Sequence, residues 1–210
     1  MVQTIAISEK TTLKFLREKF NLQRTENQQF FSEWFDGLPE IAEEEKEFLD
    51  RVKNRYFYQL DEGMLLESGV KMMIVSPLLD VAGFYDPPYK ARFEPSVQIN
   101  VDTGEEILQG RIDALVVQNQ FWVWVIEAKR TTFSLGLGIP QALAYMLCNP
   151  HPDQPTFGLL SSGDNFIFIK LVKPEEPVYA LSKQFTILND GDLYDVWRVM
   201  RRIGGLIRQE

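Results

Sequence analysis

The sequence is poor in two residues on which many functional sites depend. It contains one cysteine, Cys148, and one histidine, His151, among 210 residues. A single cysteine excludes an internal disulfide and is typical of a reducing compartment. His151 lies in a proline-rich loop without a second histidine, so we do not expect a zinc site. The N-terminus also lacks a basic stretch followed by an apolar one, and together these features predict a cytoplasmic protein.

Long apolar runs and positive charge are scarce as well. No uninterrupted apolar stretch approaches the roughly 20 residues that a membrane-spanning helix needs, so we expect no membrane partner. A complete phosphate-binding motif of the G-x-x-x-x-G-K-[ST] type is missing. The 22 lysines and arginines are outnumbered by 30 acidic residues, which gives a formal charge of −8. Because nucleic-acid binding depends on neutralising phosphates, this balance argues against tight unaided binding.

The remaining sequence has the composition of a globular protein, with 45% hydrophobic residues. This is enough for one core, and we predict one α/β domain over residues 1–210. Its parts are a helical cap (1–60), a core (63–172), and an edge strand with a closing helix (173–210). Hydrophobic periodicity predicts helices over 8–20, 25–35, 40–60, 63–83, 140–147 and 192–207. Alternating and β-branched runs predict strands over 92–101, 107–117, 121–130, 157–162, 165–172 and 178–181.

Three charged residues lie on two neighbouring expected strands, 107–117 and 121–130, at positions that point to the same face of the sheet. Only residues 118–120 separate the strands, which predicts a tight hairpin. With a three-residue loop, Asp113 lies opposite Val125 and diagonal to Glu127; with a five-residue loop, it lies opposite Glu127 itself. In both cases Asp113, Glu127 and Lys129 share one face, whereas an even-length loop or a bulge would separate them. Trp122 and Trp124 are expected together on the other face.

These charges are costly at the end of an apolar strand unless they are paired or bind a metal. The carboxylates of Asp113 and Glu127 and the backbone oxygen of Ala128 are hard ligands suited to Mg²⁺ or Mn²⁺. Lys129 would then orient the attacking water and neutralise developing charge. The alternative is a salt-bridge cluster of Lys129 with Asp113 or Glu127, which a short motif taken alone favours.

The order Asp113…Glu127-x-Lys129, followed by a helix with Gln141-x-x-x-Tyr145, resembles the PD-(D/E)XK nuclease superfamily. Within it, the sequence is similar to the N-terminal nuclease domain of type I restriction enzyme R (motor) subunits and to stand-alone cyanobacterial restriction-endonuclease-like proteins. The resemblance implies a mixed β-sheet flanked by helices. It also implies that Gln141 faces the metal-binding carboxylates as a catalytic residue, and that Tyr145 contacts nucleic acid.

Two further segments between residues 63 and 172 carry the resemblance. Residues 63–83 are similar to an early helix of the family, and Glu67 would be an additional metal ligand; a surface pair with Lys71, four residues later, is the alternative. Residues 157–170 are similar to a strand–turn–strand element, although Ser161-Ser162-Gly163 replaces the usual threonine and asparagine.

The sequence therefore predicts a divalent-metal-dependent nuclease that acts on nucleic acid, DNA rather than RNA. A homodimer and a protein partner that supplies a motor or sequence specificity are both compatible with this prediction. One alternative is a catalytically silent module that uses the same fold for binding or assembly. Another is an interaction protein that presents the aromatic residues of segment 30–35.

Overall fold

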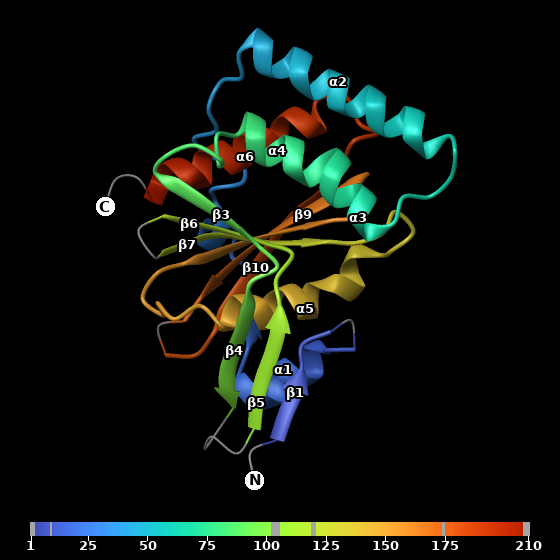
Figure 1. The fold of residues 1–210 in the computed structure, drawn as a ribbon. Coiled ribbons are helices and arrows are strands. Elements are labelled where there is room, and N and C mark those ends of the chain that lie inside the picture. Colours follow the sequence, from blue (N-terminus) through green and yellow to red (C-terminus); the bar gives the residue numbers. More distant parts are fainter. Residues whose placement is uncertain (1–2, 9, 102–105, 119–120, 174, 208–210) are drawn as a thin grey trace.

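A computed structural model of the chain shows a large mixed sheet between two layers (Figure 1). It describes residues 3–8, 10–101, 106–118, 121–173 and 175–207. The helices are α1 (Leu13–Phe20), the 3₁₀ helix η1 (Gln28–Phe31), α2 (Glu43–Leu60), α3 (Glu67–Val70), the π-helical segment η2 (Lys71–Val75), α4 (Ser76–Val81), α5 (Leu135–Leu147) and α6 (Asp192–Ile207). The strands are β1 (Gln3–Ala6), β2 (Gln23–Arg24), β3 (Tyr89–Phe93), β4 (Ser96–Val101), β5 (Glu106–Arg111), β6 (Ala114–Gln118), β7 (Phe121–Ala128), β8 (Thr156–Ser161), β9 (Asn165–Val172) and β10 (Val178–Thr186).

The large sheet has seven strands in the order β2-β10-β9-β8-β7-β6-β3. The β7–β8 and β2–β10 pairs are parallel and the other pairs are antiparallel. Every residue of β6 and β8 is buried, which explains their continuous apolar runs. The expected mixed sheet flanked by helices is confirmed. The strand expected at 178–181 is longer, and β2 pairs with its start, so it is not the terminal strand of the sheet.

Two hydrophobic clusters cover the two faces of the large sheet. On one face, α2, α4 and α6 pack in a layer (Figure 1). On the other face lie α5, α1 and a small sheet of order β1-β5-β4. The described part of residues 1–60 contains the strands β1 and β2 as well as helices, so this segment is not the purely helical cap that the sequence predicts. No helix in the described ranges is long and apolar enough to cross a membrane.

The first two expected strands each break into two at a shared corner. The chain leaves β3 at Glu94, whose φ of 51° is left-handed, and Pro95 cannot donate to a strand ladder. Opposite this turn, Ile112 and Asp113 separate β5 from β6. The Glu94 N–H donates to the Asp113 carbonyl and the Ile112 N–H to the Pro95 carbonyl, both at 3.1 Å. Asp113 therefore lies at the corner between the two sheets, directly before β6, and not inside a strand.

Two helices expected in the N-terminal half differ in the structure. The segment 25–35 forms only the short η1, because the Asn27 side chain accepts a hydrogen bond from the Gln29 N–H and closes a turn. The helix expected at 63–83 is divided into α3, η2 and α4. At the division the Ser76 N–H bonds to the Lys71 carbonyl five residues earlier, and Pro77 lies in the first turn of α4. The division follows from the N–H that Pro77 lacks.

Two further helices begin at residues other than those that the sequence predicts. The first helix begins at Leu13 and is capped by the Thr12 side chain, not by Ser8. The helix expected to start at Pro140 begins at Leu135 instead, so Pro140 lies inside α5. Gly138 explains how closely this early part packs on β8. A Cβ atom there would lie 3.0 Å from Leu160 Cδ1, so the absent side chain allows a close approach to β8.

A glycine on β5 provides a test of the packing beneath the small sheet. A Cβ on Gly110 would lie 2.6 Å from Tyr145 Cε1 and 2.8 Å from Ile7 Cβ. We expect Gly110→Ala to lower the free energy of unfolding by about 1–3 kcal/mol, measured by urea denaturation. Gly205→Ala on α6 meets nothing within 4 Å and is the matched control, expected to be neutral or stabilising. An unchanged urea midpoint for Gly110→Ala would contradict this packing.

Candidate active site

The β6–β7 hairpin differs from the expected one in two ways that cancel. Gln118 pairs with Phe121, so two residues separate the strands, which is an even number. The register then shifts between Val116 and Val117, where Val123 is the extra residue of a β-bulge. Either feature alone would place Asp113 and Glu127 out of phase. Because both are present, the register beyond the bulge returns to the phase that the sequence predicted.

Beyond the bulge, Ala114 pairs with Ile126, so Asp113 reaches the level of Glu127. The bulge has a second effect, on the tryptophans of β7. Trp124 packs with the cluster under α2, α4 and α6, whereas Trp122 packs with the cluster around α5. The expectation that both share one face was wrong, because the extra residue reverses the alternation between them.

Asp113 is bound at both carboxylate oxygens. Its Oδ2 accepts a hydrogen bond of 2.7 Å from the Ala128 N–H at the end of β7. Its Oδ1 lies 2.5 Å from the Nζ of Lys71, which comes from η2 on the other side of the site. Lys71 Nζ also lies 3.2 Å from Glu67 Oε1. Asp113 thus joins the corner of the sheets to the end of β7 and to the π-helical segment.

A second chain of contacts runs from β7 into α5. Lys129 Nζ lies 2.8 Å from Glu127 Oε1 and donates a hydrogen bond of 2.8 Å to Gln141 Oε1. Gln141 Nε2 in turn donates to the Tyr145 hydroxyl at 3.1 Å. All four side chains are buried. Gln141 and Tyr145 are one turn apart on α5, so the helix presents both to the same end of β7.

The structure brings together Asp113, Glu127, Lys129 and Gln141, and it buries the Tyr145 side chain. The Tyr145 side chain is only 2% exposed and packs against Gly110 of β5. Little of the ring is exposed in this structure, and a contact of Tyr145 with nucleic acid stays a prediction. In this position the Tyr145 hydroxyl holds Gln141.

Glu67 lies beside the site and pairs with Lys71, which is the surface-pair alternative of the sequence analysis. No group of three His, Cys, Asp or Glu side chains that could hold a metal is found in the described part of the chain. The role of Glu67 as an additional ligand beside Asp113 and Glu127 stays a prediction. Sequence reasoning missed the contact of Lys71 with Asp113. The sequence signal for this contact is limited to the position of Lys71 four residues after Glu67.

The electrostatics of the two carboxylates are unusual. Burial, together with the charge of Asp113, raises the pKa of Glu127 to about 8, although Lys129 acts in the opposite direction. Burial also raises the pKa of Asp113, against the hydrogen bonds from Lys71 and Ala128. Burial is likewise the main cause that raises the pKa of Tyr145 to about 12. Two buried acids that repel each other are destabilised as anions unless a cation joins them.

The donor atoms at this point fit a hard cation. Glu127 Oε2 is buried without a hydrogen-bond partner in the structure. In an extended strand the carbonyl of a residue points to the same side as its N–H, so the Ala128 oxygen points toward Asp113. Two carboxylates and one carbonyl are a partial oxygen set of the kind that Mg²⁺ completes with water and substrate.

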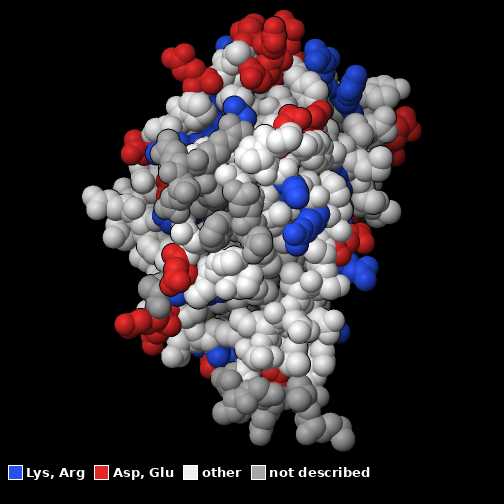
Figure 2. Space-filling view, turned by 60° about the vertical axis from the view of Figure 1, so that its left-hand side comes forward, with Lys and Arg blue, Asp and Glu red and all other residues white. Residues whose placement is uncertain are grey.

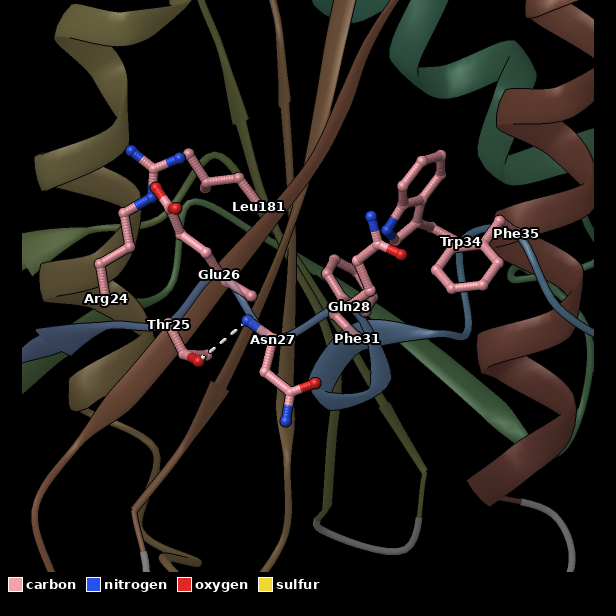
Figure 3. A pocket seen from close by; sticks show the side chains of 10 residues that line it. Arg24, Thr25, Glu26, Asn27, Gln28, Phe31, Trp34, Phe35 and Leu181 are labelled. Atoms are coloured by element: carbon pink, nitrogen blue, oxygen red, sulfur yellow. Dashed lines mark hydrogen bonds between the residues drawn. The ribbon is translucent and has the colours of Figure 1, made fainter.

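A cavity away from these side chains lies between η1 and β10 (Figure 3). It measures about 420 Å³, with Arg24 on one side and Trp34 and Phe35 on the other. None of the site side chains lines it. The aromatic segment 30–35 contributes to its wall and to the core, where Phe31 is buried, and only Phe35 is an exposed large hydrophobic residue there.

The mixed sheet, with Glu127 and Lys129 at the end of β7 and Asp113 hydrogen-bonded to that end, defines a restriction-endonuclease-like α/β protein. A sequence model of the family described as "Type I restriction enzyme R protein N terminus" matches residues 8–177. The chain belongs to this family, in agreement with the resemblance of its motifs.

A solved structure with similarity to the chain is a fragment described as an HsdR subunit of a type I restriction enzyme from Vibrio vulnificus YJ016. The two share 21% sequence identity with a TM-score of 0.44, over 68% of this chain. The match spans only 26% of that relative's length. No curated protein matches the sequence.

The raised pKa of Glu127 predicts a pH-dependent stability of the metal-free protein. Between the ordinary value of 4.5 and about 8, folded Glu127 retains a proton that the unfolded chain has lost. Its contribution to the free energy of unfolding should therefore decrease as pH rises through this window. Urea denaturation in EDTA from pH 5.5 to 8.5 measures the slope.

Glu127→Gln should make this slope less negative, whereas Glu44→Gln, at an exposed position of α2, should retain it. Equal slopes for wild type and Glu127→Gln would contradict the raised pKa.

Proposed function

We propose that this chain is a divalent-metal-dependent nuclease domain that hydrolyses phosphodiester bonds, with DNA as the substrate and Mg²⁺ or Mn²⁺ as the cofactor. One observation carries the proposal. Asp113 is hydrogen-bonded to the end of β7, where Glu127, Ala128 and Lys129 follow one another and one Glu127 oxygen is buried without a partner. Membership in the restriction enzyme family supports the same reading.

Asp113, Glu127 and the Ala128 carbonyl would hold the cation. When bound, such an ion stabilises the charge that develops on the scissile phosphate and lowers the pKa of the attacking water. The protein contributes a preorganised and largely buried set of ligands, so little reorganisation is required at the moment of reaction.

Lys129 is the proposed catalytic cation of the chain itself. Its ammonium is held between Glu127 and Gln141, at 2.8 Å from each. From this position it orients the attacking water and neutralises negative charge that develops beside Glu127. Gln141 fixes the ammonium, and Tyr145 fixes Gln141 from the core. A lysine held at two points loses less freedom when the transition state forms.

Charge distribution bears on how nucleic acid would approach. A group of acidic side chains lies at the end of the molecule formed by α2, whose first turn carries Glu43, Glu44 and Glu45, and others are spread over the rest of this face (Figure 2). With a net charge of −8, unaided binding should be weak. We therefore propose that a partner supplies a motor or sequence specificity, and that cleavage of both strands uses a homodimer. The cytoplasm is the proposed compartment.

A second function is favoured by the neutralisation of both carboxylates. Lys71 and Lys129 already pair with Asp113 and Glu127 in the structure. A site closed by its own ion pairs would suit a catalytically silent module that uses the fold for binding or assembly.

The distinguishing experiment is a cleavage assay with supercoiled plasmid, linear duplex, single-stranded DNA and RNA, in Mg²⁺, Mn²⁺ or EDTA. We expect metal-dependent cutting by the wild type, and a loss of about 100-fold or more for Asp113→Ala and for Lys129→Ala. Lys46→Met, whose lysine pairs with Glu43 on α2, is the control and should cut as the wild type does. Circular dichroism checks that each variant is folded.

Absence of metal-dependent cutting on every substrate, or an Asp113→Ala variant as fast as the wild type, would exclude the nuclease proposal. Binding of nucleic acid without cutting would then support the silent module.

Tyr145→Phe tests whether the tyrosine holds Gln141 or contacts nucleic acid. It removes the hydrogen bonds of the hydroxyl to Gln141 and to the Arg111 backbone but retains the ring. We expect the cleavage rate to fall about two- to tenfold, the effect of the one hydrogen bond to Gln141, while the Kd for DNA is unchanged. Fluorescence anisotropy measures this Kd. A weaker Kd with an unchanged rate would instead support a direct contact of Tyr145 with nucleic acid.

A further inference from the structure

Lys71 occupies the oxygen of Asp113 that a cation would require. Asp113 Oδ2 accepts the Ala128 N–H, so Oδ1 is the oxygen left for an ion. Lys71 Nζ lies 2.5 Å from this Oδ1. An ammonium and a divalent cation repel each other at such separations, especially where water is partly excluded. Binding of both at Asp113 Oδ1 is therefore disfavoured.

The surroundings of Lys71 allow its ammonium to leave Asp113. The Lys71 side chain is 28% exposed, whereas the Asp113 side chain is 12% exposed, so Lys71 is the partner in greater contact with solvent. Glu67, whose side chain is 42% exposed, lies one helical turn before Lys71, and its Oε1 is 3.2 Å from the same Nζ. Glu67 therefore offers a second anion, closer to solvent, that retains the ammonium after it leaves Asp113.

The local packing is consistent with such a movement. Lys71, Phe93, Asp113 and Ala128 line a small cavity of about 40 Å³ beside the ion pair. Lys71 also begins η2, where the backbone has widened to a π turn. Side chains beside an unfilled volume can change rotamer without displacing a packed neighbour.

We propose that Lys71 is an internal counterion that competes with the divalent cation for Asp113, and that Glu67 receives its ammonium when the cation binds. The proposal rests on the metal site of the proposed function and deepens it. In this proposal Glu67 binds the Lys71 ammonium and is not a ligand of the metal ion. At a low concentration of the divalent cation, the Lys71 ammonium stays on Asp113. The affinity of the site for the divalent cation therefore includes the free energy of displacing this ammonium.

The experiment measures Mn²⁺ binding by isothermal titration calorimetry and by electron paramagnetic resonance, on the intact chain without nucleic acid. We expect Lys71→Met and Lys71→Gln to bind Mn²⁺ on the order of tenfold more tightly than the wild type, because the competing charge is gone. Lys46→Met removes a lysine outside the site and should bind with the wild-type affinity. Asp113→Ala should abolish specific binding.

A double-mutant cycle tests the role of Glu67. Glu67→Gln should weaken Mn²⁺ binding about threefold when Lys71 is present, because the ammonium then has only Asp113 as an anionic partner. In the Lys71→Met background the same substitution should have little effect. An equal loss in both backgrounds would identify Glu67 as a ligand and overturn its proposed role.

Three results separate this inference from the proposed function. Wild-type binding that Asp113→Ala abolishes, but that folded Lys71→Met and Lys71→Gln leave unchanged or weaken, overturns the competition while the metal site stands. Binding that is detectable only after Lys71 is replaced supports it. No Mn²⁺ binding by any variant overturns both the competition and the metal site.

Discussion

The hydrogen bond from the Ala128 N–H to the Asp113 carboxylate connects the parts on which the site depends. Asp113 stands at the corner where the chain passes from the small sheet to the large one, and Ala128 ends the central strand β7. The bond fixes the distance between the corner and the strand. Because Glu127 and Lys129 flank Ala128, it also holds one carboxylate beside the other, in the register that the hairpin loop and the bulge together set.

A balance of charge follows from this arrangement. Two carboxylates brought together in a partly buried place require positive charge, and the chain provides two lysines of different character. Lys129 is buried and held by Glu127 and Gln141, so its position is fixed. Lys71 is partly exposed and lies between Asp113 and Glu67. Lys129 is therefore suited to a constant role in the site, and Lys71 to exchange with another cation. Both ammonium groups stabilise the same pair of carboxylates.

Much of the fold was predictable, because the core strands and helices carry strong apolar patterns. The runs that form β6, β7, β8 and β9 are continuous and apolar, and α2 and α6 have clear helical periodicity. The errors have local causes that such patterns do not encode. The corner depends on a left-handed Glu94, and the early start of α5 depends on the space that Gly138 leaves beside Leu160.

The sequence by itself determined which residues form the site, since Asp113, Glu127, Lys129 and Gln141 stand at spacings that one strand end and one helix can bring together. Only the tertiary structure decided the rest. It showed that an even loop and a bulge cancel in register, that Tyr145 lies under β5, and that Lys71 takes an oxygen of Asp113. These features depend on contacts between residues distant in the chain, and such contacts leave no periodic pattern in the sequence.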